Sequence, residues 1–267
     1  MIPEPAPTIR ELLAFYLEAG VDCALAEEPV DRLAELDAPP PAPRAVSAEA
    51  PRPVAAPAVM RGEAAPAPDI AIASAREAAR TAPTLEALRE LMSNFEGCAL
   101  KHTATRLVFA DGNPQARIMF VGEAPGRDED IEGLPFVGRS GKLLDLMIGA
   151  IGLNRTTAYI TNVIPWRPPG NRTPTPQETQ ICLPFIQRHI ELVNPDVLVT
   201  LGNPSTQTLL STREGIMRTR GRWFEYETGQ RTIRALPTFH PAYLLRSPSY
   251  KRLAWQDLRA IAKALAG

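Results

Sequence analysis

Cysteine and long apolar runs are scarce in this chain of 267 residues. The three cysteines, Cys23, Cys98 and Cys182, lie far apart and predict no disulfide framework, which favours a reduced, cytoplasmic setting. No run of about eighteen apolar residues is present, so no membrane-spanning helix is expected. The first residues lack a basic stretch followed by an apolar one, so they are not predicted to be a secretory signal.

The net formal charge is only −1, which argues against a generally basic nucleic-acid binder. The charge is nevertheless uneven. Residues 1–84 hold 7 of the 29 Lys and Arg residues and 13 of the 30 Asp and Glu residues. The remainder therefore holds 22 basic and 17 acidic residues. This asymmetry is compatible with a polyanionic partner for the second part, and equally with two ordinary solvated surfaces.

Three segments are predicted along the chain. Residues 1–37 form an N-terminal helical segment, because residues 12–17 place apolar side chains at helical spacing. Residues 38–69 are rich in Pro and Ala and are predicted to be a disordered linker, since they cannot bury enough apolar surface to offset their ordering entropy. Residues 70–267 form the main domain. The N-terminal helix has two candidate docking places, the main domain or a protein partner.

Apolar, β-rich runs alternate with helical patterns in the main domain. The predicted strands occupy residues 117–122, 158–164, 196–202 and 232–239. The clearest helical patterns occupy residues 70–93, 141–152, 176–193 and 203–210. This alternation predicts an α/β fold with a mainly parallel sheet covered by helices on both faces. Ligands bind beyond the carboxyl ends of such strands, so the loops after the first, second and fourth strands are expected to meet in one cleft.

Four side chains in these loops have chemistry that suits a flat heterocycle: Glu123, Phe136, Asn162 and His240. Each alone has an ordinary explanation as a core, capping or hydrogen-bonded structural residue. As a set, they suit the recognition of a base. A Phe ring can stack on the base, and an Asn amide can pair with an adjacent carbonyl and N–H on its edge. A His and the backbone N–H groups of "GEAPG" stabilise negative charge on a carbonyl oxygen. A carboxylate orients water, so the set predicts cleavage of an N-glycosidic bond.

Long motifs within residues 94–265 resemble a known family. They read "VFADGNPQARIMFVGEAPGRDEDIEGLPFVGRSGKLLD", "YITNVIPWRPPGNRTPTPQE", "PDVLVTLG" and "PTFHPAYLLRSP". In this order they resemble the uracil-DNA glycosylase superfamily, and most of all its family 4, the thermophile-type enzymes. The resemblance implies a three-layer αβα sandwich with a central, mainly parallel four-stranded sheet. It also implies base excision repair, in which the enzyme flips uracil out of DNA and hydrolyses its N-glycosidic bond.

The resemblance assigns the uracil-binding roles residue by residue. Gly122 opens the first motif, and the backbone N–H near Ala124 would bind uracil O2. Phe136 would stack on the flipped base, and Asn162 would read its O4 and N3–H. His240 would stabilise the departing uracil anion at O2.

The catalytic carboxylate is less directly assigned. The best-known branch of the superfamily has a water-activating Asp where this chain has Ala124. The acid here stands one position earlier, at Glu123, which is therefore the leading candidate. Asp128 is the weaker one.

A further group of residues lies in or beside the motif loops and would contact DNA. Flipping a base costs about a few kcal/mol, which phosphate contacts and an inserted wedge must offset. The stretch "HPAYLLRSP" resembles the family's loop that enters the duplex and fills the gap left by the extruded nucleotide. The candidate DNA-binding residues are Arg139, Ser140, Lys142, Arg167, Arg172, Leu244, Leu245 and Arg246.

Family 4 enzymes usually carry an iron–sulfur cluster on four cysteines. The corresponding positions here are Phe95, Cys98, Trp166 and Cys182. Two thiolates cannot hold a four-iron cluster that takes four. We therefore expect no cofactor, with the two aromatic residues filling the space and the two cysteines packed beside them. A partial metal site completed by His102 is the alternative, although no ligand spacing supports it.

Other functions are weighed against this hypothesis. A related branch traps uracil-DNA covalently through a His near "RPPGNR"; this chain has no His there, so turnover is expected. A catalytically weak uracil- or DNA-binding module of the same fold is the main alternative. An unrelated nucleotide-binding enzyme is disfavoured, because the chain has no Walker-type loop and no strand-linked G-x-G-x-x-G. The expected partner is uracil-containing DNA, and the expected state is a monomer.

Overall fold

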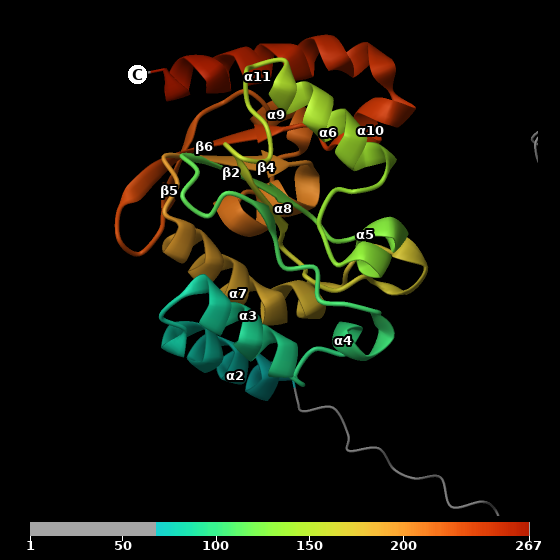
Figure 1. The fold of residues 1–267 in the computed structure, drawn as a ribbon, viewed down its shortest axis with the longest axis vertical. Coiled ribbons are helices and arrows are strands. Elements are labelled where there is room, and N and C mark those ends of the chain that lie inside the picture. The colour runs from blue at the N-terminus through green and yellow to red at the C-terminus, as the bar shows by residue number, and fades with distance from the viewer. Residues whose placement is uncertain (1–67, 267) are drawn as a thin grey trace, which may run out of the picture. The chain divides into compact units, whose positions relative to one another are not determined.

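A computed structural model of the chain describes residues 68–266 (Figure 1). The helical segment predicted at residues 1–37 lies outside the described residues, as does nearly all of the linker predicted at residues 38–69. The first described helix starts at Pro68, two residues before the predicted start of the main domain.

The centre of the domain is one six-stranded sheet with the order β1-β3-β2-β4-β6-β5. The four inner strands are parallel, whereas β1 and β5 pair antiparallel with β3 and β6 at the two edges. The four predicted strands are therefore confirmed, and the two edge strands are additions. The strands are β1 (Asp111–Gly112), β2 (Ile118–Gly122), β3 (Tyr159–Asn162), β4 (Val197–Leu201), β5 (Phe224–Glu227) and β6 (Thr232–Thr238).

Helices connect the strands. The segment predicted as helical at 70–93 is two helices, Pro68–Thr81 and Leu85–Asn94, and the helix Lys251–Leu265 was not among the predicted patterns. The helices predicted at 176–193 and 203–210 have those bounds in the structure. None of the described helices is both long and apolar enough to cross a lipid bilayer. The helices are α2 (Pro68–Thr81), α3 (Leu85–Asn94), α4 (Leu100–Thr103), α5 (Arg127–Glu132), α6 (Arg139–Gly149), α7 (Pro176–Val193), α8 (Asn203–Leu210), α9 (Ile216–Thr219), α10 (Pro241–Arg246) and α11 (Lys251–Leu265), with 3-10 turns η2 (Pro169–Asn171) and η3 (Pro248–Tyr250).

Two helical layers enclose the sheet, with α6, α10 and α11 on one side and α2, α3 and α7 on the other (Figure 1). Successive residues of β2 point alternately to the two layers. Ile118 and Phe120 share a core with α6 and α11, whereas Met119 and Val121 share a core with α2, α3 and α7. Because both faces of the sheet are covered, the two central strands β2 and β4 are buried along their whole length. The predicted three-layer αβα sandwich is confirmed.

Candidate active site

One pocket lies beyond the carboxyl ends of β2, β3 and β6, with a volume of about 360 Å³. Glu123 directly follows β2, Asn162 ends β3, and His240 comes two residues after β6. Phe136 reaches the same pocket from the loop between α5 and α6. The structure thus brings together the four side chains that the sequence singled out, although up to 117 positions separate them along the chain. Parallel strands explain this convergence, because their carboxyl ends share one edge of the sheet.

Gly122 pairs with the pocket residue Asn162 across β2 and β3. A Cβ atom on Gly122 would lie 2.3 Å from Asn162 Oδ1 and 2.6 Å from Phe136 Cζ. The glycine therefore lets the amide and the ring approach the same bare stretch of backbone. Any larger residue at position 122 would displace one or both of them.

Asn162 is 4% exposed, and its Oδ1 has no hydrogen-bond partner within the described part of the chain. Leaving a buried carbonyl oxygen unpaired costs about 1–3 kcal/mol, and such atoms are rare in folded proteins. The amide is therefore placed to accept a hydrogen bond from a ligand that enters the pocket.

Phe136 and His240 form the adjoining wall. Their ring centroids lie 5.4 Å apart with an interplanar angle of 30°. Phe136 is 4% exposed and adopts the left-handed backbone region, with φ 56°. A non-glycine residue in this region is uncommon and requires surrounding contacts to hold it.

His240 caps the N-terminus of α10 with its own side chain. The backbone N–H of Ala242 donates to His240 Nδ1 at 3.1 Å. Burial, together with the positive charge of Arg246, lowers the pKa of His240 to about 4. The imidazole is therefore neutral near pH 7. Since Nδ1 accepts a hydrogen bond, the ring proton resides on Nε2, which makes the side chain a neutral hydrogen-bond donor.

Glu123 lies where the pocket opens between β2 and β3. Its backbone carbonyl accepts from Ile164 N at 2.9 Å, which fixes the residue against the neighbouring strand. Burial raises the pKa of the Glu123 carboxyl above its usual range. The weaker carboxylate candidate, Asp128, is exposed and lies in the neighbouring groove rather than in the pocket.

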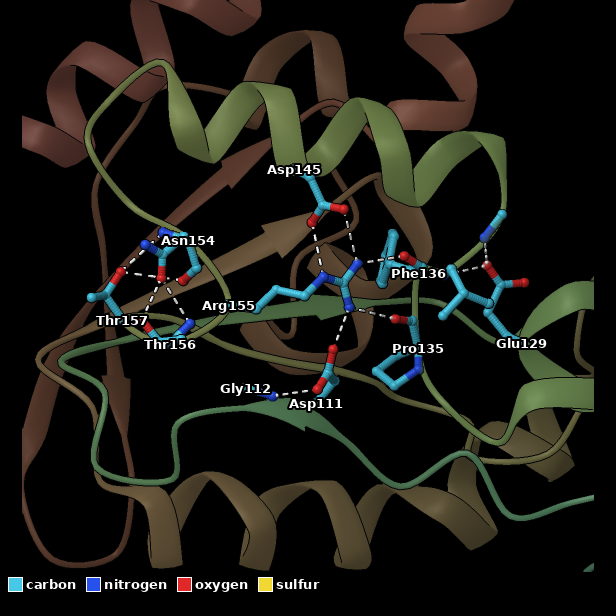
Figure 2. Close-up of polar contacts among 12 residues, drawn as sticks. Asp111, Gly112, Glu129, Pro135, Phe136, Asp145, Asn154, Arg155, Thr156 and Thr157 are labelled. Carbon is cyan, nitrogen blue, oxygen red and sulfur yellow. Dashed lines mark hydrogen bonds and ion pairs between the residues drawn. The ribbon is translucent and has the colours of Figure 1, made fainter.

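Glu129 is a positioning residue that the sequence did not single out. Its Oε2 accepts a hydrogen bond from Gly126 N at 3.0 Å. Its Oε1 accepts from Val137 N and Gly138 N at 3.1 Å each, and these two contacts are drawn at Glu129 in Figure 2. It thereby ties the first motif to the loop that carries Phe136. In the sequence, Glu129 is one of five acids between residues 123 and 132, and nothing in that pattern shows that its carboxylate binds three backbone amides.

Several of the predicted DNA contacts line the pocket or the groove beside it. Ser140, Arg172 and Arg246 line the pocket, and Arg139 and Leu245 line the adjoining groove. Lys142 is exposed on α6. Asn171, which the sequence did not indicate, borders both hollows.

Three of the residues predicted to contact DNA are already bound to other side chains or buried. Arg172 donates to both oxygens of Glu178, at 2.9 and 2.6 Å. Arg167 donates to Asn171 Oδ1 at 2.7 Å. Leu244 is 1% exposed and belongs to the core beneath α10, so it has no surface to offer to DNA. Leu245 and Arg246 are the exposed residues of that loop.

The four positions that correspond to the family's cluster ligands are all buried in one core. A side-chain hydrogen bond with Cys182 lowers the pKa of the Cys98 thiol, so the two sulfurs are neighbours. The Phe95 ring packs edge-on against Phe185, with 5.0 Å between ring centroids, and Trp166 is 2% exposed. Two thiols and two aromatic rings do not provide the four thiolates that a four-iron cluster takes. The residues present therefore do not fit that group.

Comparisons with known proteins agree with this geometry. Residues 109–259 match the family model described as the Uracil DNA glycosylase superfamily. The chain is 40% identical to the type-4 uracil-DNA glycosylase of Sulfurisphaera tokodaii, an alignment covering 67% of this chain and 83% of the relative. It is 41% identical to that of Archaeoglobus fulgidus, over 65% and 89% of the two chains. It is 40% identical to that of Thermotoga maritima, over 65% and 91%.

Proposed function

Because this chain belongs to the uracil DNA glycosylase superfamily, we propose that it is a DNA repair enzyme that excises uracil from DNA. The observation that carries the proposal is the buried Oδ1 of Asn162, which no described residue pairs, in a pocket that the Phe136 ring also lines. An amide in that place distinguishes bases by their hydrogen-bonding edge. The reaction hydrolyses the N-glycosidic bond and leaves an abasic site.

The base is recognised after it leaves the duplex, because its glycosidic bond is hidden within the stack. Asn162 accepts from uracil N3–H through Oδ1 and donates to O4 through its Nδ2. Phe136 stacks on the base, and the absence of a side chain at Gly122 lets the Asn162 amide and the Phe136 ring lie close together. Cytosine presents an acceptor at N3 and a donor at N4, so it does not match this arrangement.

The leaving group departs as an anion whose charge spreads over N1 and O2. His240 Nε2–H donates to O2, and the backbone N–H near Ala124 adds a second donor. Such donors, aimed where charge develops, lower the barrier by about 3–4 kcal/mol each. A neutral imidazole suffices for this role, so no proton needs to pass to the base.

Water attacks C1′ of a sugar that becomes oxocarbenium-like. Glu123 stands at the pocket mouth, where its carboxylate orients this water and favours the cationic sugar. The DNA strand lies along the adjoining groove, where Arg139, Ser140 and Arg246 contact phosphates. Leu245 is the apolar residue that fills the gap left by the extruded base.

The enzyme works without an iron–sulfur cluster. Two of the four ligand positions carry aromatic side chains, and these rings fill the volume that the cluster would otherwise occupy. The two buried thiols then act as small apolar groups of the core.

The first experiment tests the activity and the cofactor together. The purified protein, in EDTA, is incubated with a labelled oligonucleotide containing one uracil, and abasic sites are then cleaved with alkali. We expect a colourless protein without iron that cleaves at uracil with multiple turnovers, and leaves a matched thymine oligonucleotide intact. Binding of uracil-DNA without cleavage would support the alternative of a binding module, and bound iron in the active protein would overturn the cluster-free proposal.

The pH dependence of excision follows from the shifted pKa values of Glu123 and His240. Glu123 must be ionised and His240 neutral, so protonation of either group lowers the rate on the acid side. The single-turnover rate is therefore expected to rise through the elevated pKa of Glu123 and then stay level to about pH 8. The measurement is a rate profile from about pH 4 to pH 9. A further rise near the ordinary histidine pKa of about 6.5 would contradict a neutral, buried His240.

A further inference from the structure

Arg155 lies in the loop between α6 and β3, outside the pocket, and reaches across to the loop that carries Phe136 (Figure 2). Its Nη1 donates to the Pro135 carbonyl at 3.2 Å, and its Nη2 donates to the Phe136 carbonyl at 2.5 Å. Asp111 and Asp145 hold the same guanidinium at 2.5 and 2.9 Å. The rigid fork of the guanidinium is thereby committed to one arrangement around two consecutive backbone carbonyls.

The backbone at Phe136 needs such support. Its φ of 56° lies in a region that side-chain-bearing residues rarely adopt. The start of α6 also approaches it closely, since a Cβ atom on Gly141 would lie 1.7 Å from the Phe136 carbonyl oxygen. Arg155 therefore binds the carbonyl at the point where the chain turns and α6 begins.

The other side of the same loop is bound by Glu129, which accepts from the backbone amides of Val137 and Gly138. Carbonyls before the turn and amides after it are thus each fixed by a charged side chain. The backbone that carries the Phe136 ring is therefore fixed on both sides, and the ring itself packs beside His240 at 5.4 Å between centroids. This restriction matters because a stacking surface acts only when its plane matches that of the base.

We propose that Arg155 is a positioning residue for base recognition, which acts by holding the Phe136 ring in the plane against which the flipped base stacks. The inference rests on the proposed function. Arg155 itself touches neither the base nor the reacting atoms. Its effect on excision therefore passes through Phe136, which distinguishes it from a residue that only stabilises the fold.

A double-mutant cycle tests this path. Arg155→Met is expected to lower single-turnover excision about tenfold or more in the otherwise unchanged protein. In a Phe136→Leu background the same substitution is expected to change the rate by less than about twofold, because the ring that Arg155 positions is gone. Should Arg155→Met fold poorly, Asp145→Asn loosens the guanidinium from the half-exposed side, and a smaller loss with the same dependence on Phe136 is expected.

Arg188→Met is the matched control. Arg188 also binds a backbone carbonyl, donating to Ala82 O at 3.0 and 2.7 Å, and it pairs with Glu191 at 2.6 Å. Its side chain is 21% exposed, against 26% for Arg155. It lies away from the pocket, so its loss is expected to lower the melting temperature and leave excision within about twofold.

Binding separates failure of this inference from failure of the proposed function. The probe is an oligonucleotide that carries one fluorinated deoxyuridine resistant to hydrolysis. If the unmodified protein neither binds this probe nor excises uracil, the proposed function fails. The proposed function holds if the unmodified protein binds the probe and excises uracil. In that case the inference is overturned if Arg155→Met lowers the excision rate equally with and without the Phe136 ring. It is also overturned if Arg155→Met lowers that rate no more than Arg188→Met does, because Arg155 would then be structural only.

Discussion

Replacing Asn162 by Ala is expected to lower kcat/KM for uracil excision about 10²- to 10³-fold. In the proposed function the amide supplies both hydrogen bonds to the edge of the base, and Asn162 is 4% exposed. Without it, uracil N3–H and O4 would enter a buried site unpaired, which is costly. The melting temperature is expected to change little, because Oδ1 has no partner to lose within the described residues. Steady-state kinetics on a uracil oligonucleotide and a thermal melt provide the two measurements.

Asn203→Ala is the matched control for this prediction. Asn203 is the other residue of the described chain whose buried Oδ1 has no hydrogen-bond partner. It begins α8 and lines a different, open depression. Its replacement is expected to leave excision within about threefold. Equal losses in the two variants would show that the effect at Asn162 comes from a disturbed fold and not from lost recognition.

His240→Ala is expected to lower single-turnover excision about 10²- to 10³-fold, while binding of uracil-containing DNA weakens by no more than about threefold. The difference is expected because, in the proposed function, the Nε2–H of His240 donates to an oxygen that becomes charged only as the glycosidic bond breaks. Excision rates and a binding isotherm on the hydrolysis-resistant probe separate the two quantities.

His102→Ala serves as the control for the histidine variant. His102 is exposed, with its Nε2 3.5 Å from Glu96, and it lies outside the pocket. It should leave both excision and binding unchanged. If His240→Ala reduced excision and binding equally, the histidine would act in binding, and the module without turnover would become the better description.

The elements that the sequence predicted are those with a strong local pattern. The helix at 176–193 begins with a capping box, in which Thr175 and Glu178 exchange hydrogen bonds, and ends at Asn194 in the left-handed region. The central strands β2 and β4 are buried, mainly apolar runs, as expected when both faces of a sheet are covered. The edge strands β1 and β5 escaped prediction, because they are short and lack such runs.

The members of the candidate site could be predicted from the chemistry of their side chains and from their places at the ends of predicted strands. Glu123, Phe136, Asn162 and His240 could be grouped, since parallel strands end at one edge. The sequence could not decide which of Leu244 and Leu245 is exposed to DNA. Both are leucines in one turn of helix, and only the packing of that helix determines which of them faces the core.

The residues that support the site could not be predicted either. Glu129 and Arg155 act on backbone groups, and a loop's conformation decides which groups are in reach. An isolated arginine in the sequence gives no sign that it will meet two carbonyls 19 and 20 positions earlier.

The two edge strands have a consequence for how copies of this protein behave toward one another. A long, flat edge strand offers free N–H and C=O groups that can pair with another chain and seed aggregation. Here one edge ends in a strand of two residues. The other ends in a strand of four residues that carries exposed Glu225 and Glu227. Short length at one edge and repelling charge at the other both discourage sheets from joining, which favours a protein that stays dispersed when concentrated.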